Sequence, residues 1–219
     1  MVANAVDALG RFRDAPLTFG RTSWGTDRWA SPQAPPLRKY HLSADSQALT
    51  AFADKCTAQA AAACSVPMRA GVHRAEFSVR CGPANADAQV CIGIARPDFD
   101  PSDSDARDDF AQSGRCFWLW NASPTSEWAA DVGRADLPWI GLEFGKQEQR
   151  LALELNMDSG TLSASSRGER LGVLADVQPG RAPRWSIARG GPWCWLAILY
   201  TRSDAGTASG TVRVRQLRE

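Results

Sequence analysis

Residues 150–174, RLALELNMDSGTLSASSRGERLGVL, alternate apolar and polar side chains, stop at a turn, and alternate again. A period of two is typical of a strand with one buried face. Asp158-Ser159-Gly160 and Arg167-Gly168-Glu169 carry turn chemistry, because glycine accepts a positive φ and aspartate can bond back to its own backbone. The stretch therefore predicts two consecutive hairpins of an antiparallel sheet. The side chains expected to face the core from its first strand are Leu151, Leu153, Leu155 and Met157.

The same period of two recurs along the chain. Residues 193–200, WCWLAILY, are apolar on both faces and predict a central, buried strand. About ten short strands separated by turns, with no long helix, predict an all-β fold, a two-sheet antiparallel β-sandwich. Further residues expected to point inward are Ala75, Phe77, Val79, Val90, Ile92, Ile94, Val212 and Val214, with Arg213 and Arg215 outward.

The chain of 219 residues suits one large β domain. We expect residues 1–39 to form an irregular N-terminal segment that packs on the domain, because prolines interrupt it while its aromatic residues require cover. Residues 40–219 are then a single domain. Residues 48–64 are rich in alanine, and local propensity there favours a helix, against the strand signals around them.

Several motifs, in their order along the chain, resemble the SPRY domain family over roughly residues 66–215. The family's Gly-x-His and following strand correspond to Gly71-Val72-His73-Arg74-Ala75-Glu76-Phe77, and its Gly-Val-Ala-Arg-like strand to Ile92-Gly93-Ile94-Ala95-Arg96-Pro97. The family's Asp-x-x-Gly-Thr-Leu-Ser turn resembles residues 158–163, DSGTLS, which have one residue fewer between Asp and Gly. Its Asn-Gly-x-x-Leu-Gly turn is matched by residues 167–172, and a late strand end by Leu199-Tyr200. Arg74-Ala75 replaces the aromatic pair that follows the histidine in the family, and Arg167 replaces the asparagine of the second turn. The resemblance therefore does not predict that this chain binds the family's ligands.

This resemblance implies two bent antiparallel sheets of the concanavalin-like sandwich type, with little helix. It also implies a non-catalytic module that binds partner proteins with loops at one end of the sandwich. Because SPRY domains have strands before the Gly-x-His motif, it predicts strands at residues 48–52 and 56–64 in place of a helix. A single copy of such a domain suggests that the protein is an adaptor or a subunit.

The overall charge and the cysteines give no sign of nucleic acid, membrane or metal. The net charge of +1 provides no strong field for nucleic acid or an anionic membrane, and no segment has the roughly 20 apolar residues that a spanning helix requires. Six cysteines occur without a Cys-x-x-Cys pair, so we expect no metal site and no cofactor, and we interpret Cys91, Cys116 and Cys194 as small apolar fillers. The N-terminus does not resemble a secretory signal, so we expect an intracellular, cytoplasmic protein.

Two features offer chemistry other than protein binding. Glu154 and Asp158 resemble the paired carboxylates of a glycoside hydrolase, but Asn156 stands between them and Asp158 fits the first position of a turn. Residues 98–109 carry six aspartates, which could hold calcium or contact a partner, although an EF-hand pattern fails there. His73 is interpreted as a structural residue of its strand.

We expect the partner, another protein or peptide, to bind three chemically unusual loops, because binding residues concentrate on loops held by a rigid scaffold. These loops are the acidic one, the arginine-rich one around Trp185, and the one after Tyr200. Two alternatives stay open: a carbohydrate-binding or glycan-cleaving sandwich, and a structural subunit of a larger assembly. The predicted partner-binding residues are Asp98, Asp100, Asp103, Arg184, Trp185, Arg189, Arg202 and Asp204.

Overall fold

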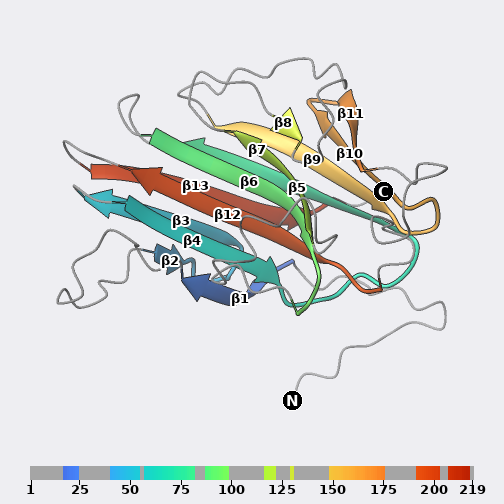
Figure 1. The fold of residues 1–219 in the computed structure, drawn as a ribbon, viewed down its shortest axis with the longest axis horizontal. Coiled ribbons are helices and arrows are strands. Elements are labelled where there is room, and N and C mark those ends of the chain that lie inside the picture. Colours follow the sequence, from blue (N-terminus) through green and yellow to red (C-terminus); the bar gives the residue numbers. More distant parts are fainter. Residues whose placement is uncertain are drawn as a thin grey trace.

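The computed structural model describes residues 17–24, 40–54, 57–81, 87–98, 116–121, 129–130, 148–175, 191–202 and 207–217. These residues form two antiparallel sheets that lie face to face and contain no helix (Figure 1). The six-stranded sheet has the order β1 (Phe19–Trp24), β4 (Thr57–Cys64), β12 (Cys194–Arg202), β6 (Asp87–Ala95), β7 (Cys116–Asn121) and β8 (Ala129–Ala130). The seven-stranded sheet has the order β11 (Glu169–Ala175), β10 (Thr161–Ser166), β9 (Gln149–Asn156), β5 (Val72–Cys81), β13 (Thr207–Gln216), β3 (Ala48–Asp54) and β2 (Tyr40–Leu42).

The core lies between the two sheets and is built from the residues that the alternation predicted. On β9 the burial alternates along the whole strand, with Leu151, Leu153 and Leu155 inside. Phe77 and Trp195 meet across the core edge to face, with ring centroids 6.0 Å apart, so aromatic packing joins the two sheets. The predicted inward positions are confirmed: Ala75, Phe77, Val79, Val90, Ile92, Ile94, Met157, Val212 and Val214 are buried, and Arg213 and Arg215 are exposed.

Strand β12 is the central strand that its composition predicted. It pairs with β4 on one side and β6 on the other, and every residue from Cys194 to Leu199 is buried. The alanine-rich stretch next to it forms strands, as the family resemblance predicted and local propensity did not. Because β4 pairs with β1 on one side and β12 on the other, tertiary pairing here outweighs the helix propensity of alanine.

The expectation of an irregular N-terminal segment is wrong for Phe19–Trp24, which forms β1 and pairs with β4 at the edge of the six-stranded sheet. Phe19 is only 2% exposed, so its burial anchors this strand to the core. A β-bulge follows Phe19, and a Cβ at Gly20 would overlap the side chain of Ser65. The rest of residues 1–39, apart from Leu17 and Thr18, lies outside the described residues, and the domain boundary at residue 40 stays a prediction.

The two predicted hairpin turns are confirmed. Met157–Gly160 joins β9 to β10, and Gly160 has a φ of 69°. Arg167 and Gly168 join β10 to β11 with φ values of 51° and 83°. Two consecutive positive φ angles are typical of the hairpin turn that favours Asn-Gly, so Arg167 occupies a backbone conformation that its side chain disfavours.

We expect Arg167→Asn to raise the free energy of unfolding by about 0.5–1 kcal/mol, because asparagine tolerates the left-handed region better than arginine does. Chemical denaturation followed by tryptophan fluorescence measures this difference. Arg170→Asn is a suitable control, since Arg170 is also exposed but lies in β11 without a positive φ. Equal effects of the two substitutions would contradict the turn assignment.

Candidate functional site

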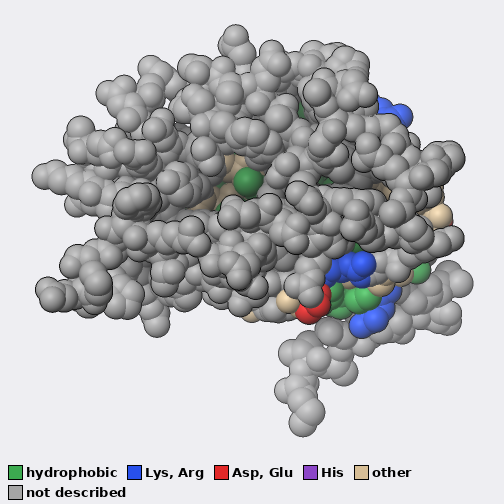
Figure 2. Space-filling view, in the orientation of Figure 1, with side chains coloured by type: hydrophobic (Ala, Val, Ile, Leu, Met, Phe, Trp, Pro, Cys, Tyr) green, Lys and Arg blue, Asp and Glu red, His purple; other side chains and the backbone are tan. Residues whose placement is uncertain are grey.

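Three chain segments meet at one end of the sandwich. They are the connection from β4 to β5, the residues that follow β6, and the residues that lead into β12. Met68 and Trp193 exchange two backbone hydrogen bonds of 2.6 and 2.9 Å, and Ala95 at the end of β6 lies opposite Cys194 at the start of β12. Figure 2 shows basic, acidic and apolar side chains gathered together at the lower right of the displayed face.

Arg96 and Trp193 form the centre of this end. The guanidinium carbon of Arg96 lies 4.5 Å from the ring centroid of the buried Trp193, which is a cation–π contact. Gly191 has a φ of 76°, and a Cβ there would lie 3.1 Å from an Nη atom of Arg96. A larger residue at position 191 would therefore strain the backbone and crowd the arginine. From the sequence we expected a tryptophan–arginine site at Trp185. The pair of Arg96 with Trp193 was not predicted, although Arg96 lies in the motif of residues 92–97 that resembles the SPRY family.

His73 stabilises the turn before β5. Its Nε2–H donates to the carbonyl of Ala70 at 2.8 Å, next to Gly71, whose φ is 79°. Burial lowers the pKa of His73, against smaller opposing effects of this hydrogen bond and of the Asp158 carboxylate. The imidazole is therefore neutral near pH 7, in agreement with the structural role predicted for it.

The shift at His73 predicts a stability that falls in acid. With its pKa lower in the folded than in the unfolded chain, the unfolded chain takes up more protons as the pH falls through the ordinary histidine range, and stability drops. We expect His73→Asn to show a smaller loss of stability than the native chain between about pH 7.5 and pH 5. Urea unfolding at the two pH values measures it. The exposed His41 provides the control, and an equal change in the His41→Asn variant would contradict the assignment.

The residues considered for glycoside hydrolysis have other partners. Glu154 accepts a hydrogen bond of 2.7 Å from Nε of Arg74, across the β5–β9 pair. The side-chain oxygen of Asn156 accepts from the backbone N–H groups of Asp158 and Ser159, at 3.0 and 2.9 Å, and so caps the turn. Asp158 lies exposed in that turn, beyond the last residue of β9.

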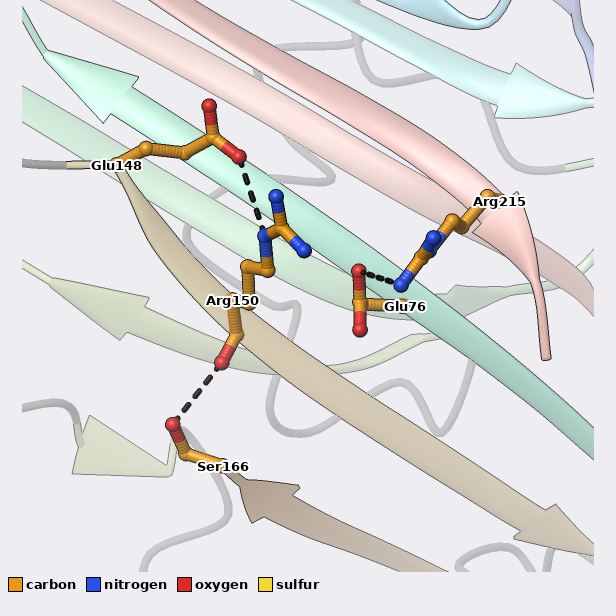
Figure 3. A network of polar contacts seen from close by, with 5 residues as sticks. All are labelled: Glu76, Glu148, Arg150, Ser166 and Arg215. Carbon is orange, nitrogen blue, oxygen red and sulfur yellow. Dashed lines mark hydrogen bonds and ion pairs between the residues drawn. The ribbon is translucent and has the colours of Figure 1, made fainter. Parts of the chain in front are cut away.

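The outer face of the seven-stranded sheet carries charged side chains that form ion pairs. Glu76 of β5 is the most enclosed of them, with its side chain 15% exposed, and its Oε1 lies 2.7 Å from Nη2 of Arg215. Within the described part of the chain, no hydrogen bond of good geometry reaches Oε1 of Glu76. The ion pair with Arg215 therefore offsets the cost of burying this oxygen. Figure 3 shows Glu76 with Arg215 on one side and Arg150 on the other. Arg150 in turn pairs with Glu148, at 3.3 Å.

The described residues contain neither a metal-ligand cluster nor a spanning helix. In that part of the chain, no three His, Cys, Asp or Glu side chains gather as they would around a metal ion. No helix there is long and apolar enough to cross a membrane. Cys64 and Cys194 are buried, which fits the filler interpretation of Cys194, and burial strongly raises the pKa of the Cys64 thiol. The side chain of Cys116, and all but one of the aspartates proposed for calcium, lie outside the described residues.

The sequence matches no known family profile, and no curated protein matches it. Solved structures do match. The SPRY domain of human HERC1 superposes with a TM-score of 0.54 at 10% identity, over 82% of this chain and 94% of that one. The fold is that of the SPRY-type sandwich.

Two further structures share this sandwich. One, from a study of endo-acting O-glycanases of the human gut microbiota, has a TM-score of 0.52 at 11% identity, covering 93% of this chain and 92% of that one. The other is the exoplasmic/lumenal domain of VIP36, bound to Ca²⁺ and Man3GlcNAc, with a TM-score of 0.50 at 10% identity, covering 93% and 89%. At such identities the likeness establishes the fold alone.

Within the SPRY-type sandwich, the predicted binding residues do not share one end. Asp98 is exposed just after β6, beside the Arg96–Trp193 contact. Arg202 is the last of the nine residues of β12 and pairs with Asp87, the first residue of β6. At about 3.3 Å per residue, the two ends of β12 are roughly 26 Å apart. The other predicted residues lie outside the described residues: Asp100, Asp103, Arg184, Trp185, Arg189 and Asp204.

The two predicted binding residues that the structure describes, Asp98 and Arg202, do not form the single surface expected from the sequence. Asp98 belongs to the end where β6 finishes and β12 starts, whereas Arg202 belongs to the opposite end. Gly191 lies at the Asp98 end, next to Arg96, whereas Arg184, Trp185 and Arg189 precede it in the sequence and lie outside the described residues. Strand direction was the missing information, because the sequence alone does not say which strand ends lie together.

Proposed function

We propose that this chain is a non-catalytic protein-interaction module, an adaptor or a subunit, which binds a partner protein at the Asp98 end of the sandwich. The observation that carries the proposal is the SPRY-type fold, which spans 94% of the HERC1 SPRY domain. The shape of this end supports it. Arg96 and Trp193 contact each other there, and in the sequence they adjoin the acidic residues 98–109 and the arginine-rich residues 181–189. Loops on a rigid scaffold are common binding sites.

An intracellular location is part of this proposal. In the part of the chain that the structure describes, Cys64 is a buried thiol, and thiols are the usual state of cysteine in the reducing interior of a cell. Expression of a fluorescently tagged chain in the native cell, followed by fractionation, tests the location. Recovery from the secreted fraction would contradict it.

Affinity capture from the native cell, with mass spectrometry, tests the binding end. One variant neutralises Asp98, Asp100 and Asp103 as asparagines, and a second replaces Arg184 and Arg189 by alanine. A third, the control, changes Arg202, the last residue of β12, and Asp204, which follows it in the sequence. We expect the first two variants to lose partners that the control retains. Loss only in the control variant would place the binding end at the other side of the molecule.

A second candidate function is glycan binding or cleavage. One structure with this fold is described as bound to Man3GlcNAc and another comes from a study of O-glycanases, and Glu154 is the acid on β9 considered for such chemistry. The ion pair of Glu154 with Arg74 favours a structural role for it over catalysis. A glycan array and a hydrolysis assay separate the two functions. Hydrolysis that Glu154→Gln abolished, while Glu148→Gln retained it, would favour the glycan-cleaving function over the interaction module.

A further inference from the structure

The ion pairs on the outer face of the seven-stranded sheet divide it into two halves. Around Glu76 and Glu154 the pairs are short, 2.7 Å each, and each joins one arginine to one carboxylate. Around Ser78 the pairs are longer. Arg150 contacts Glu148 at 3.3 Å through Nε alone, and Arg213 lies 3.5 Å from Asp45. The ion pairs of the second half are therefore longer than those of the first.

Three arginines surround Ser78 on the same face. Ser78 of β5 lies directly opposite Arg150 of β9 on one side and Arg213 of β13 on the other. Arg80 is two residues further along β5 and points to the same face, because side chains alternate along a strand. All three are exposed, and Arg80 makes no ion pair with any residue that the structure describes.

The spacing of these arginines fits an extended chain. Neighbouring strands are about 4.8 Å apart, so the Cα atoms of Arg150 and Arg213 are roughly 10 Å apart, and Arg80 lies about 7 Å along β5 from Ser78. Alternate side chains of an extended peptide are also about 7 Å apart. Carboxylates at alternate positions of such a peptide can therefore reach Arg80 and the pair of arginines beside Ser78.

The existing acids do not block this binding. Exposed ion pairs contribute only about 0–1 kcal/mol, so a carboxylate from a partner can replace Glu148 or Asp45 at little cost. Arg150 and Arg213 are 59% and 51% exposed and keep guanidinium nitrogens that these pairs do not use. Hydrogen bonds with the Ser43 hydroxyl and the Gln47 N–H lower the pKa of Asp45, so it stays ionised and competes, weakly, with a partner's carboxylate for Arg213.

We propose that Arg80, Arg150 and Arg213 form a docking face for an extended acidic segment of a partner protein, with carboxylates at alternate positions. The proposal rests on the function proposed above, because it names the chemistry of a partner contact. Arginine suits this ligand, since its planar guanidinium can bind a carboxylate through two parallel hydrogen bonds. The three strands that carry the arginines, β9, β5 and β13, are interior strands of the sheet, so their spacing is fixed.

Fluorescence anisotropy with a labelled peptide of Glu-Thr repeats tests the proposal, at about 50 mM and at about 300 mM salt. We expect R80Q/R150Q/R213Q to weaken binding at least about tenfold and to reduce its salt dependence. The control R69Q/R167Q/R170Q removes the same charge from exposed arginines elsewhere and should change the affinity less than about twofold. D45N/E148Q should strengthen binding of the peptide. If the triple variant does not fold, this increase in affinity is the test of the docking face.

Equal losses in the two triple variants, or no gain in D45N/E148Q, would overturn the proposal. Tighter binding of a sulfated oligosaccharide than of the peptide would also overturn the proposal. Self-association that depends on the same arginines would overturn it too, because it would assign the face to the aspartates of a second copy. Affinity capture separates this failure from that of the proposed function. Partners captured equally by the native chain and R80Q/R150Q/R213Q would remove the docking face and leave the interaction module. No partner captured by the native chain would contradict the module itself.

Discussion

Leu153→Asp is expected to unfold this protein or bring it close to unfolding. Leu153 is 1% exposed in the middle of β9 and faces the core. An aspartate there would place a carboxylate among apolar side chains without a partner, at a cost of about 4 kcal/mol or more. Domains are typically stable by only about 5–15 kcal/mol, so the loss is a large part of the total. Urea denaturation followed by tryptophan fluorescence measures it.

Arg213→Ala is the control for this change. Arg213 points outward from β13, and its ion pair with Asp45 is long and exposed. We expect its loss to change the free energy of unfolding by no more than about 0.5 kcal/mol. If the two substitutions cost the same, the assignment of inner and outer faces is wrong.

Trp195→Ala is expected to be the second most damaging change. Trp195 lies on the central strand of the six-stranded sheet, is 1% exposed, and meets Phe77 of the other sheet edge to face. Removing a buried aromatic side chain typically costs about 3–5 kcal/mol, because it loses apolar burial and leaves a cavity. Thermal and chemical denaturation measure the loss. Trp195→Phe should cost less, since it keeps a ring against Phe77, and a loss below about 1 kcal/mol in Trp195→Ala would contradict this packing.

The strands of the sandwich could be predicted from the sequence where one face of the strand is exposed to solvent and the other is buried. On β9 and β13 the alternation sorts each residue to one side, so the order of the residues is enough to separate buried from exposed positions. The alanine-rich β4 could not be predicted in this way, because alanine fits either face and favours a helix when alone. Strand β1 was missed, since FGRTSW shows no alternation and its place depends on the burial of Phe19 and on pairing with β4.

The site was less predictable than the fold, because its contacts depend on strand register and direction. Arg96 and Trp193 meet through the pairing of β6 with β12, although they are far apart in the sequence. The pair of Arg74 with Glu154 depends on the register of β5 with β9 in the same way. Nothing in the local composition indicates these partners. Because strand direction is equally hidden in the sequence, Arg202 and Asp98 were expected on one surface.

The late position of β12 and β13 in the chain sets the order in which the protein can fold during synthesis. Strand β12 joins β4 to β6, and β13 joins β3 to β5, so each of these earlier pairs lacks its middle partner until residues 194–216 have left the ribosome. Until then, β4 and β6 expose unpaired backbone edges, as do β3 and β5. Such edges are templates for wrong pairing and aggregation. We therefore expect nascent chains stalled before residue 194 to depend on chaperones, and folding to complete in one late step.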